Sequence, residues 1–420
     1  MARAAQLTTP PSEALDALRE AACDSTYVSM GSRRTTTVHE FYRYPARFSP
    51  RFVRAAIAAF TSPGDVILDP FVGGGTTVAE AMLMGRRSVG ADINPLAVFV
   101  ARTKTLTHTT SSLSAVESWL DTVSTQLNVH GPRADDEAWY EDGYLRHLDG
   151  HDTWRIRKII GQALVGLDSI RGPAARDLAR LVVLRTAQWA LDMRSEVPSV
   201  SEFRGKLVAA GRPMLEVARS FASDTTAAFG SKVAADDVRT IIEQRIDGLA
   251  SHPDLAGASP VLTLTSPPYP GVYVLYHRWK LRGRLETAAP FWIADRRDGH
   301  GIAHYTMAAK APTLDRYFTA LAEGFAEVAV VAPPGSWCVQ MVGFGDVAEQ
   351  LPRYIEAMHS VGFDEVMFDG LANADDGRCW RHVPSRRWWV TSASKQGTAA
   401  HTANEVVLVF RRSPRALQQP

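Results

Sequence analysis

Apolar residues follow two patterns along this chain, a helical periodicity and short continuous runs, which distinguish helical segments from strands. In residues 50–60 the apolar positions lie one helical turn apart, which predicts an amphipathic helix. Residues 66–68 form a short, wholly apolar run of the kind that builds a strand buried on both faces of a parallel sheet. Residues 76–85 read as a helix that ends at a glycine, and residues 88–91 as a second strand. Residues 66–92 therefore predict one strand–turn–helix–strand unit, the start of a doubly wound sheet.

The rest of the chain returns to this alternation after a long helical interruption. Helical periodicity dominates residues 113–229, and strand character returns beyond them. Residues 1–37 predict a flexible tail with one short helix at residues 12–22. The later elements that the pattern predicts are strands at residues 231–238, 261–265, 337–342 and 365–368, helices at residues 314–331 and 347–361, and a closing hairpin of residues 388–391 with 406–410. This order predicts an α/β fold with a helical insertion.

Composition excludes several classes of protein. The chain has 420 residues, of which 45% are hydrophobic and 22% charged, as in ordinary globular proteins. Collagen-like, disulfide-stapled and wholly disordered chains are excluded. No apolar run approaches the roughly 18 residues that suggest a membrane span, and the start of the chain has no apolar core of a signal peptide. Three cysteines are too few and too scattered for a disulfide framework or a zinc site. We expect a cytoplasmic protein without a metal or a membrane partner.

The charge balance leaves the class of partner open. Lys plus Arg number 46 against 45 for Asp plus Glu, a formal net charge of +1. Non-specific affinity for nucleic acid comes from concentrated positive charge, which this total does not indicate. A local basic patch would suffice, so binding to nucleic acid is not excluded. Two short motifs are more informative than the composition.

The first motif is a glycine-rich turn, Asp-Pro-Phe-Val-Gly-Gly-Gly-Thr-Thr, at residues 69–77, between a predicted strand and a predicted helix. Glycines let the backbone approach a ligand closely, and the helix N-terminus offers unpaired N–H groups. The turn lacks the Gly-Lys-Ser/Thr ending of a nucleoside triphosphate loop. Asp92, at the end of the next strand, has the spacing at which a carboxylate binds ribose hydroxyls in dinucleotide folds. The structural alternatives are a plain turn and, for Asp92, a helix cap before Pro95.

The second motif is Ser266-Pro267-Pro268-Tyr269, which follows the predicted strand 261–265. Ligands of open α/β sheets bind outside the carboxyl ends of strands, so this tetrapeptide is placed to act on a ligand. The two prolines remove backbone donors and leave the Ser266 and Pro267 carbonyls as fixed acceptors. Tyr269 supplies a flat face for stacking. Acceptors beside a stacking ring suit a planar substrate with an amino group, such as a nucleobase.

Together the two motifs resemble those of the S-adenosylmethionine-dependent amino-methyltransferases of DNA. Serine at the first position of the tetrapeptide resembles the cytosine-N4 branch, whereas Asp or Asn there is typical of adenine-N6 enzymes. The resemblance covers residues 42–102 and 231–411 and leaves the helical segment unexplained. It implies a Rossmann-like class I methyltransferase fold, a doubly wound and mostly parallel sheet with an antiparallel closing hairpin. The implied organisation is a flexible N-terminal tail at 1–37, a catalytic domain at 38–107 and 231–412, and at 108–230 a helical insertion that is a candidate target-recognition region.

The resemblance also implies roles for individual residues. The catalytic residues it implies are Ser266, Pro267, Pro268 and Tyr269. The S-adenosylmethionine-binding residues it implies are Tyr44, Pro45, Ala46 and Phe48 before the first strand, Asp69, Pro70, Phe71, Gly73, Gly75 and Thr76 in the turn, Asp92 and Ile93 after the second strand, and Asp237 near the adenine amino group. Asp236 is a rival to Asp237, and a solvated turn acid is an alternative for both. For Ile93 the alternative is an ordinary apolar strand residue, and for residues 44–48 a plain lead-in to the helix.

Two segments interleave basic and aromatic residues, as a loop that stacks on bases and binds phosphates would. The first consists of Tyr273, Tyr276, His277, Arg278, Trp279, Lys280, Arg282 and Arg284, and the second of Arg378, Trp380, Arg381, His382, Arg386, Arg387, Trp388 and Trp389. Either segment could instead be a surface loop with buried tryptophans. His277 could be a general base, although a lone histidine is more often structural.

The expected function is methylation of the exocyclic N4 of a cytosine that has been flipped out of double-stranded DNA. In this hypothesis the Ser266 oxygen and the Pro267 carbonyl accept the amino N–H bonds, while Tyr269 stacks on the base. Adenine-N6 or RNA-base methylation is the first alternative, and a non-catalytic DNA-binding module is the second. For such an enzyme, a restriction or defence-system partner is a further expectation.

Overall fold

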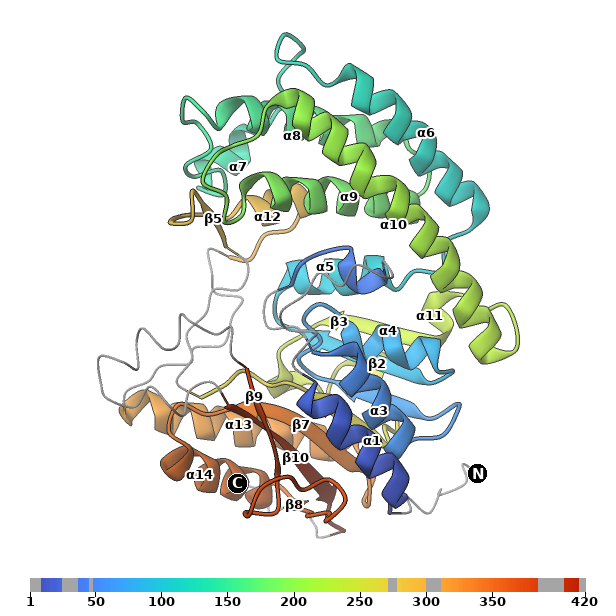
Figure 1. Ribbon diagram of the computed structural model, residues 1–420, viewed down its shortest axis with the longest axis vertical. Helices are drawn as coiled ribbons and strands as arrows, with labels where there is room; N and C mark the ends of the chain where they lie inside the picture. The colour runs from blue at the N-terminus through green and yellow to red at the C-terminus, as the bar shows by residue number, and fades with distance from the viewer. Residues whose placement is uncertain are drawn as a thin grey trace.

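The computed structural model describes residues 9–24, 37–44, 48–270, 278–299, 311–383 and 404–414. A helical block lies above an α/β layer built around one sheet (Figure 1). The described helices of the block come mainly from residues 110–229, and those of the α/β layer flank the sheet on both faces. The helical interruption expected from the sequence is therefore present.

The sheet has the strand order β3-β2-β1-β4-β7-β10-β8, and β9 pairs with β10. Its strands are β1 (Val66–Asp69), β2 (Arg87–Asp92), β3 (Arg239–Glu243), β4 (Leu262–Thr265), β7 (Trp337–Gly343), β8 (Phe363–Glu365), β9 (Cys379–His382) and β10 (Asn404–Arg412). Strands β3, β2, β1, β4 and β7 run parallel to one another, whereas β10 is antiparallel to its three partners. This doubly wound, mostly parallel sheet with an antiparallel closing strand confirms the Rossmann-like class I fold.

The strand order reverses between β1 and β4, which are hydrogen-bonded neighbours. The chain first adds β2 and β3 on one side of β1, and then β4 and β7 on the other side. Open α/β sheets bind ligands at this switch point, outside the carboxyl ends of the strands. The glycine-rich turn follows β1, and Ser266–Tyr269 follows β4. The topology therefore brings both sequence motifs to one edge of the sheet.

Helices cover both faces of the sheet because successive strand residues point to opposite sides. Ile67 packs in the core with α1 (Ser12–Cys23) and α3 (Pro50–Phe60), whereas Leu68 packs with α13 (Ala311–Val331) and α14 (Val347–Ser360). Two further helices, α4 (Thr76–Leu83) and α5 (Pro95–Lys104), follow the first two strands. None of the helices within the described ranges is long and apolar enough to cross a membrane.

The helical block consists of α6 (Thr110–Gln126), α7 (Glu137–Glu141), α8 (Trp154–Val165), α9 (Pro173–Leu191) and α10 (Val200–Phe229), with the 3-10 turn η2 (Gly166–Ser169). A later segment joins it: the hairpin of β5 (Trp279–Leu281) with β6 (Leu285–Thr287), and helix α12 (Ala289–Ala294). Phe291 and Trp292 share one core with Leu178 and Ile159 of the block. This core also includes Phe99 of α5, so the block is packed onto the α/β layer.

The structure corrects three expectations from the sequence. Helix α1 is not part of a flexible tail, because Leu18 is fully buried in the core that also contains Phe52. Residues 278–298 pack with the helical block, although they were expected to belong wholly to the catalytic domain. The prediction of a strand at 231–238 is wrong, because this segment contains α11 (Ala235–Val238). The strand is β3, which includes the β-branched residues that follow.

Other expected elements were correct in kind but displaced. The strand near residue 365 is β8, which begins two residues before the expected start. Of the closing hairpin, β10 is present, and residues 388–391 lie outside the described residues. The remaining short 3-10 turns are η1 (Val38–Glu40), η3 (Ile246–Gly248) and η4 (Pro253–Leu255).

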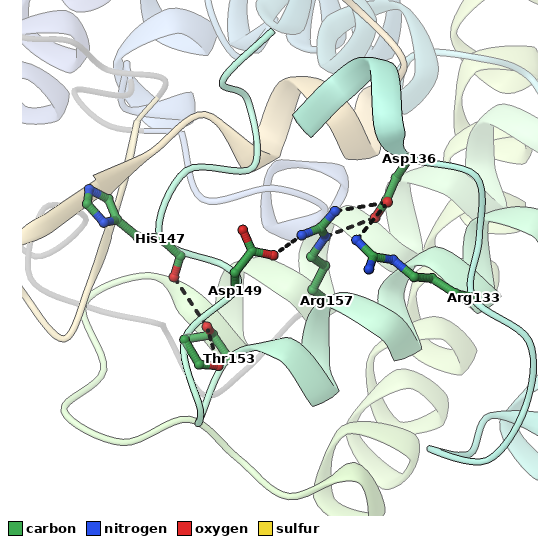
Figure 2. Close-up of polar contacts among 7 residues, drawn as sticks. Arg133, Asp136, His147, Asp149, Thr153 and Arg157 are labelled. Atoms are coloured by element: carbon green, nitrogen blue, oxygen red, sulfur yellow. Dashed lines mark hydrogen bonds and ion pairs between the residues drawn. The ribbon is translucent and has the colours of Figure 1, made fainter. Parts of the chain in front are cut away.

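A buried ion pair organises one end of the helical block (Figure 2). Arg157 of α8 donates from Nε and Nη2 to the two carboxylate oxygens of Asp136, each at 2.9 Å. Both side chains are almost completely buried, whereas Asp149 and Arg133, which also contact this pair, are largely exposed. Beside it, the Thr153 hydroxyl donates to the His147 carbonyl and closes the loop before α8.

Removing the buried acid of this pair should destabilise the protein strongly. Asp136→Ala leaves the Arg157 guanidinium buried with only an exposed partner, a change that typically costs about 3–5 kcal/mol. Asp149→Ala is the matched control, because its carboxylate is exposed and should contribute less than about 1 kcal/mol. Urea unfolding followed by circular dichroism measures both. Equal midpoints for the two variants would show that burial of this pair does not matter.

Candidate active site

The glycine-rich turn adopts backbone angles that favour glycine at two of its positions. Gly73 and Gly75 have φ values of +47° and +72°, in the left-handed region. A Cβ atom on Gly75 would lie 2.8 Å from the Cβ of Ala101, so α5 packs directly against the turn. A Cβ on Gly73 would lie 3.2 Å from the Tyr44 ring. The glycines therefore permit close packing on both sides of the turn.

Asp92 fastens the end of β2 to this turn. Its carboxylate accepts hydrogen bonds from the Gly73 N–H at 2.9 Å and from the Asn94 N–H at 2.8 Å. The cap of α5 is Asn94, whose side chain accepts from the N–H groups of Leu96 and Ala97. Asp92 is thus not the helix cap that the sequence left open as an alternative. Burial raises its pKa to about 6.

Asp69 links the two sequence motifs directly. It is 3% exposed, at the end of β1, and its Oδ1 accepts from the Thr265 hydroxyl at 2.7 Å and from the Phe71 N–H at 3.2 Å. Thr265 is the last residue of β4 and precedes Ser266. Burial raises the pKa of Asp69 to about 6, although these hydrogen bonds act in the opposite direction.

The Ser-Pro-Pro-Tyr segment is held by hydrogen bonds to neighbouring elements. The Ser266 hydroxyl donates to the Met341 carbonyl of β7 at 3.1 Å, and the Tyr269 hydroxyl donates to Glu405 Oε1 of β10 at 2.7 Å. Tyr317 donates to the Pro268 carbonyl at 3.0 Å. With its proton directed at Met341, the Ser266 oxygen has lone pairs that can accept from a ligand. Pro267 is buried beside it.

The tyrosine of this segment is held in place by its neighbours. Tyr269 is 8% exposed, and a Cβ on Gly343 would lie 3.0 Å from its ring. Its partner Glu405 is fully buried and is also paired with Arg381. The hydroxyl therefore has a structural role that the sequence did not reveal, and loss of it would leave a buried carboxylate short of a donor.

The other expected cofactor residues lie in different surroundings. Tyr44 covers the glycine turn, whereas Phe48 is buried with its ring 5.5 Å from that of Phe52. Thr76 is buried at the start of α4, the Phe71 ring is 6.5 Å from that of Phe325, and Pro70 and Ile93 directly follow Asp69 and Asp92. Pro45 and Ala46 lie outside the described residues.

The expectation for Asp237 is corrected by the sheet. Asp237 is exposed in α11, before β3 begins, and its rival Asp236 is exposed and paired with Arg239. Both acids lie at the amino end of β3, opposite the edge that carries Asp92. In the parallel register it is Glu243 that stands across from Asp92. The β-branched run before Glu243 is the signal in the sequence that locates this strand end.

Several residues of the two basic and aromatic segments are buried or form ion pairs within the protein. Trp279 is 2% exposed, and Arg278 pairs with the buried Asp298 at 2.8 Å. Arg378 binds both oxygens of Glu365, and Arg381 pairs with Glu405. These four side chains are structural, whereas Lys280, Arg282 and Arg284 are exposed. Residues 273–277 and 386–389 of these segments lie outside the described residues.

No group of three or more His, Cys, Asp or Glu side chains that could hold a metal ion occurs in the described part of the chain. The polar groups at the switch point are instead acceptors: two carboxylates, a hydroxyl and proline carbonyls. Such a set is suited to a ligand that carries several N–H and O–H donors.

The raised pKa of Asp69 predicts a pH-dependent stability that Asp69→Asn removes. A folded-state pKa of about 6, above the ordinary 3.8, means that the folded protein binds this proton more tightly than the unfolded chain. The corresponding stabilisation is fully present below pH 3.8 and is lost as the pH rises through about 6. Asp69→Asn should therefore stabilise the ligand-free protein by about 1–3 kcal/mol at pH 8 and by less at pH 5. Urea unfolding at both pH values measures this, and a less stable variant at pH 8 would contradict it.

Comparison with known proteins matches the part of the chain that carries the turn. Residues 23–102 match the family model N6_N4_Mtase, described as DNA methylase. The type II methyltransferase M.MjaII of Methanocaldococcus jannaschii is 39% identical over 71 residues, 17% of this chain and 13% of that protein. The type II methyltransferase M.BsoBI of Geobacillus stearothermophilus is 41% identical over 70 residues, 16% of this chain and 14% of that protein. The DNA adenine methyltransferase YhdJ of Escherichia coli is 38% identical over 55 residues, 13% of this chain and 19% of that protein.

Each of these matches spans less than a fifth of the relative's own length. The matched family segment includes the glycine-rich turn and Asp92, and it ends before the Ser-Pro-Pro-Tyr segment. Residues 23–102 are therefore similar to the DNA methylases of the N6/N4 family, and this similarity is limited to the segment that carries the turn.

Proposed function

We propose that this protein is a DNA methyltransferase that transfers the methyl group of S-adenosylmethionine to the exocyclic N4 of a flipped cytosine. The observation that carries the proposal is the hydrogen bond of 2.7 Å between Asp69 and Thr265. It joins the first residue of the glycine-rich turn to the residue before Ser266, and so supports a donor site and a target site at one edge of the sheet. Neither the glycine-rich turn nor the tetrapeptide, taken alone, would require the two motifs to lie side by side.

The residues at this edge fit S-adenosylmethionine. Asp69 and Asp92 are carboxylates whose raised pKa values reflect burial without a cationic partner strong enough to offset it. The ribose hydroxyls and the ammonium group of the cofactor are donors of the kind that both carboxylates would accept. Asp92 would hold the ribose, and the turn at Gly73, covered by Tyr44, would take the methionine end. When bound, the cofactor supplies an electrophilic methyl group.

The target side would act by orientation. An exocyclic amino group is a poor nucleophile because its lone pair is delocalised into the ring. The Ser266 oxygen, with its proton directed at Met341, and the Pro267 carbonyl would accept the two amino N–H bonds. This would turn the nitrogen lone pair towards the methyl group, so that positioning and electrostatics account for most of the rate. Tyr269, held by Glu405, would form the wall against which the flipped base stacks.

Adenine-N6 methylation is the second candidate. Serine in the tetrapeptide favours cytosine, yet the relatives of the turn segment include a DNA adenine methyltransferase. Double-stranded DNA is the proposed substrate, since the relatives are named as type II or DNA methyltransferases, and a restriction or defence-system partner remains part of this proposal. Intact Asp69, Asp92 and Ser266 argue against a non-catalytic DNA-binding module.

Labelling of nucleic acids tests the reaction itself. Duplex DNA and RNA are incubated with the protein and methyl-labelled S-adenosylmethionine, and their nucleosides are analysed by mass spectrometry. We expect N4-methyldeoxycytidine from DNA. N6-methyldeoxyadenosine would overturn the choice of base, and label in RNA alone would overturn the choice of polymer. If no label transfers and calorimetry detects no cofactor binding, the enzyme proposal is wrong.

A pair of substitutions separates catalysis from cofactor binding. Ser266→Ala should lower kcat strongly, because it removes an acceptor that aligns the nucleophile in the transition state, and should leave the cofactor Kd unchanged. Asp92→Ala should instead weaken cofactor binding, by roughly 1.5–3 kcal/mol for a lost charged acceptor. Ser360→Ala, an exposed helix-end serine, is the control. Calorimetry and initial rates distinguish the two effects, and full activity of Ser266→Ala would refute the role of its hydroxyl.

A further inference from the structure

A glutamine of the helical block makes a two-point contact with the cofactor side of the site. Gln188 lies in the last turn of α9 and is 4% exposed. Its side-chain Nε2 donates to the Arg43 carbonyl at 2.9 Å, and its Oε1 accepts from the Arg43 N–H at 3.0 Å. One amide thus binds both backbone polar groups of a residue that lies 145 positions earlier in the chain.

This contact fixes the peptide next to the residue that covers the glycine turn. Tyr44 follows Arg43 directly, and its ring lies where a Cβ on Gly73 or Gly74 would be 3.2 or 3.3 Å away. The Tyr44 N–H also donates to the Tyr42 carbonyl at 3.0 Å, which makes a tight turn around Arg43. The position of the Tyr44 ring therefore depends on how Arg43 is held.

The segment has a second, independent anchor at its beginning. His39 Nε2 lies 2.8 Å from Glu80 Oε1 of α4, and both side chains are buried. Burial alone would raise the pKa of Glu80, and the bonds to His39 and Arg54 outweigh this and lower it. Residues 37–44 are thus tied to the α/β layer at one end and to the helical block at the other. Loss of the Gln188 contact should loosen one end of the segment without unfolding it.

We propose that Gln188 is a positioning residue for the cofactor site, so that the helical block forms part of that site. The proposal rests on the proposed function, since it concerns the binding of S-adenosylmethionine under Tyr44. It assigns to the block a task separate from any recognition of DNA. Gln188 acts through Arg43 and Tyr44 and does not itself touch the glycine turn.

The same end of α9 also contacts strand β5. Asp192, directly after the helix, accepts from the Lys280 N–H at 3.2 Å, and the Met193 N–H donates to the Lys280 carbonyl at 2.9 Å. Trp279 of the same strand donates to the Tyr42 hydroxyl at 3.2 Å. Strand β5 follows the Ser-Pro-Pro-Tyr segment in the chain, so one helix end fastens the strand beyond the target motif together with the segment over the glycine turn.

Gln188→Met tests this inference. Methionine has nearly the same volume but neither polar atom, so both bonds to Arg43 are lost while packing is kept. We expect the Kd for S-adenosylmethionine to rise about tenfold, consistent with the loss of two ordinary hydrogen bonds. The KM for the cofactor should rise likewise, whereas kcat at saturating cofactor should stay near that of the wild type. Gln162→Met is the matched control, because its amide binds the backbone of Asn128 and Pro132 within the block and should leave the Kd unchanged.

Hydrogen exchange supplies a readout that needs no cofactor. In the ligand-free protein, well below the melting temperature of each variant, Gln188→Met should speed amide exchange in residues 37–44, and Gln162→Met should not. Should the methionine variant fail to fold, Gln188→Asn gives the same comparison, because an amide one methylene shorter cannot reach both Arg43 atoms.

The outcomes separate the two proposals. Unchanged exchange and unchanged Kd in Gln188→Met would overturn the positioning role and leave the methyltransferase proposal intact. If the wild type itself does not bind S-adenosylmethionine, the proposed function fails, and with it the role of Gln188 in a cofactor site. The exchange measurement then still shows whether Gln188 holds the segment. Faster exchange together with weaker cofactor binding supports both proposals.

Discussion

A buried hydrogen bond, from the Thr265 hydroxyl to the Asp69 carboxylate, spans the point at which the order of the sheet reverses. The two residues end neighbouring parallel strands: Asp69 begins the glycine-rich turn, and Thr265 precedes the Ser-Pro-Pro-Tyr segment. Because β1 and β4 pair in a defined register, the relative position of the glycine turn and Ser266 follows from the sheet itself. Sites built on strand ends are more precise than sites on loops, which suits a transfer reaction that depends on alignment.

This arrangement lowers the stability of the folded protein at two buried carboxylates, those of Asp69 and Asp92. A carboxylate that is buried without a strong cationic partner is less stable than one in water, and the raised pKa values of Asp69 and Asp92 express that penalty. A ligand rich in hydrogen-bond donors would offset this free-energy penalty. The ligand-free protein is therefore less stable than its core would allow, a common trade between stability and binding.

Much of the fold was predictable from the sequence, and the reasons for the failures are physical. The apolar run at residues 66–68, the glycines and the tetrapeptide are local signals, and each lies where its pattern indicates. Asp237 was misjudged because the strand boundary lies beyond it, and α1 because burial of a short helix depends on its tertiary neighbours. The partnerships of Gln188 with Arg43 and of Tyr269 with Glu405 join residues 145 and 136 positions apart. Such pairs leave no trace in local periodicity.

The place of β10 in the sheet has a consequence for how the protein forms. This strand lies between β7 and the edge strands β8 and β9, although it follows all of them in the chain. Its Glu405 is the buried partner that fixes Tyr269. During synthesis, Tyr269 can be held by Glu405 only after the ribosome has made β10, when the glycine turn, the helical block and β4 have already emerged. The final position of Tyr269 is thus coupled to completion of the sheet, which comes late in synthesis.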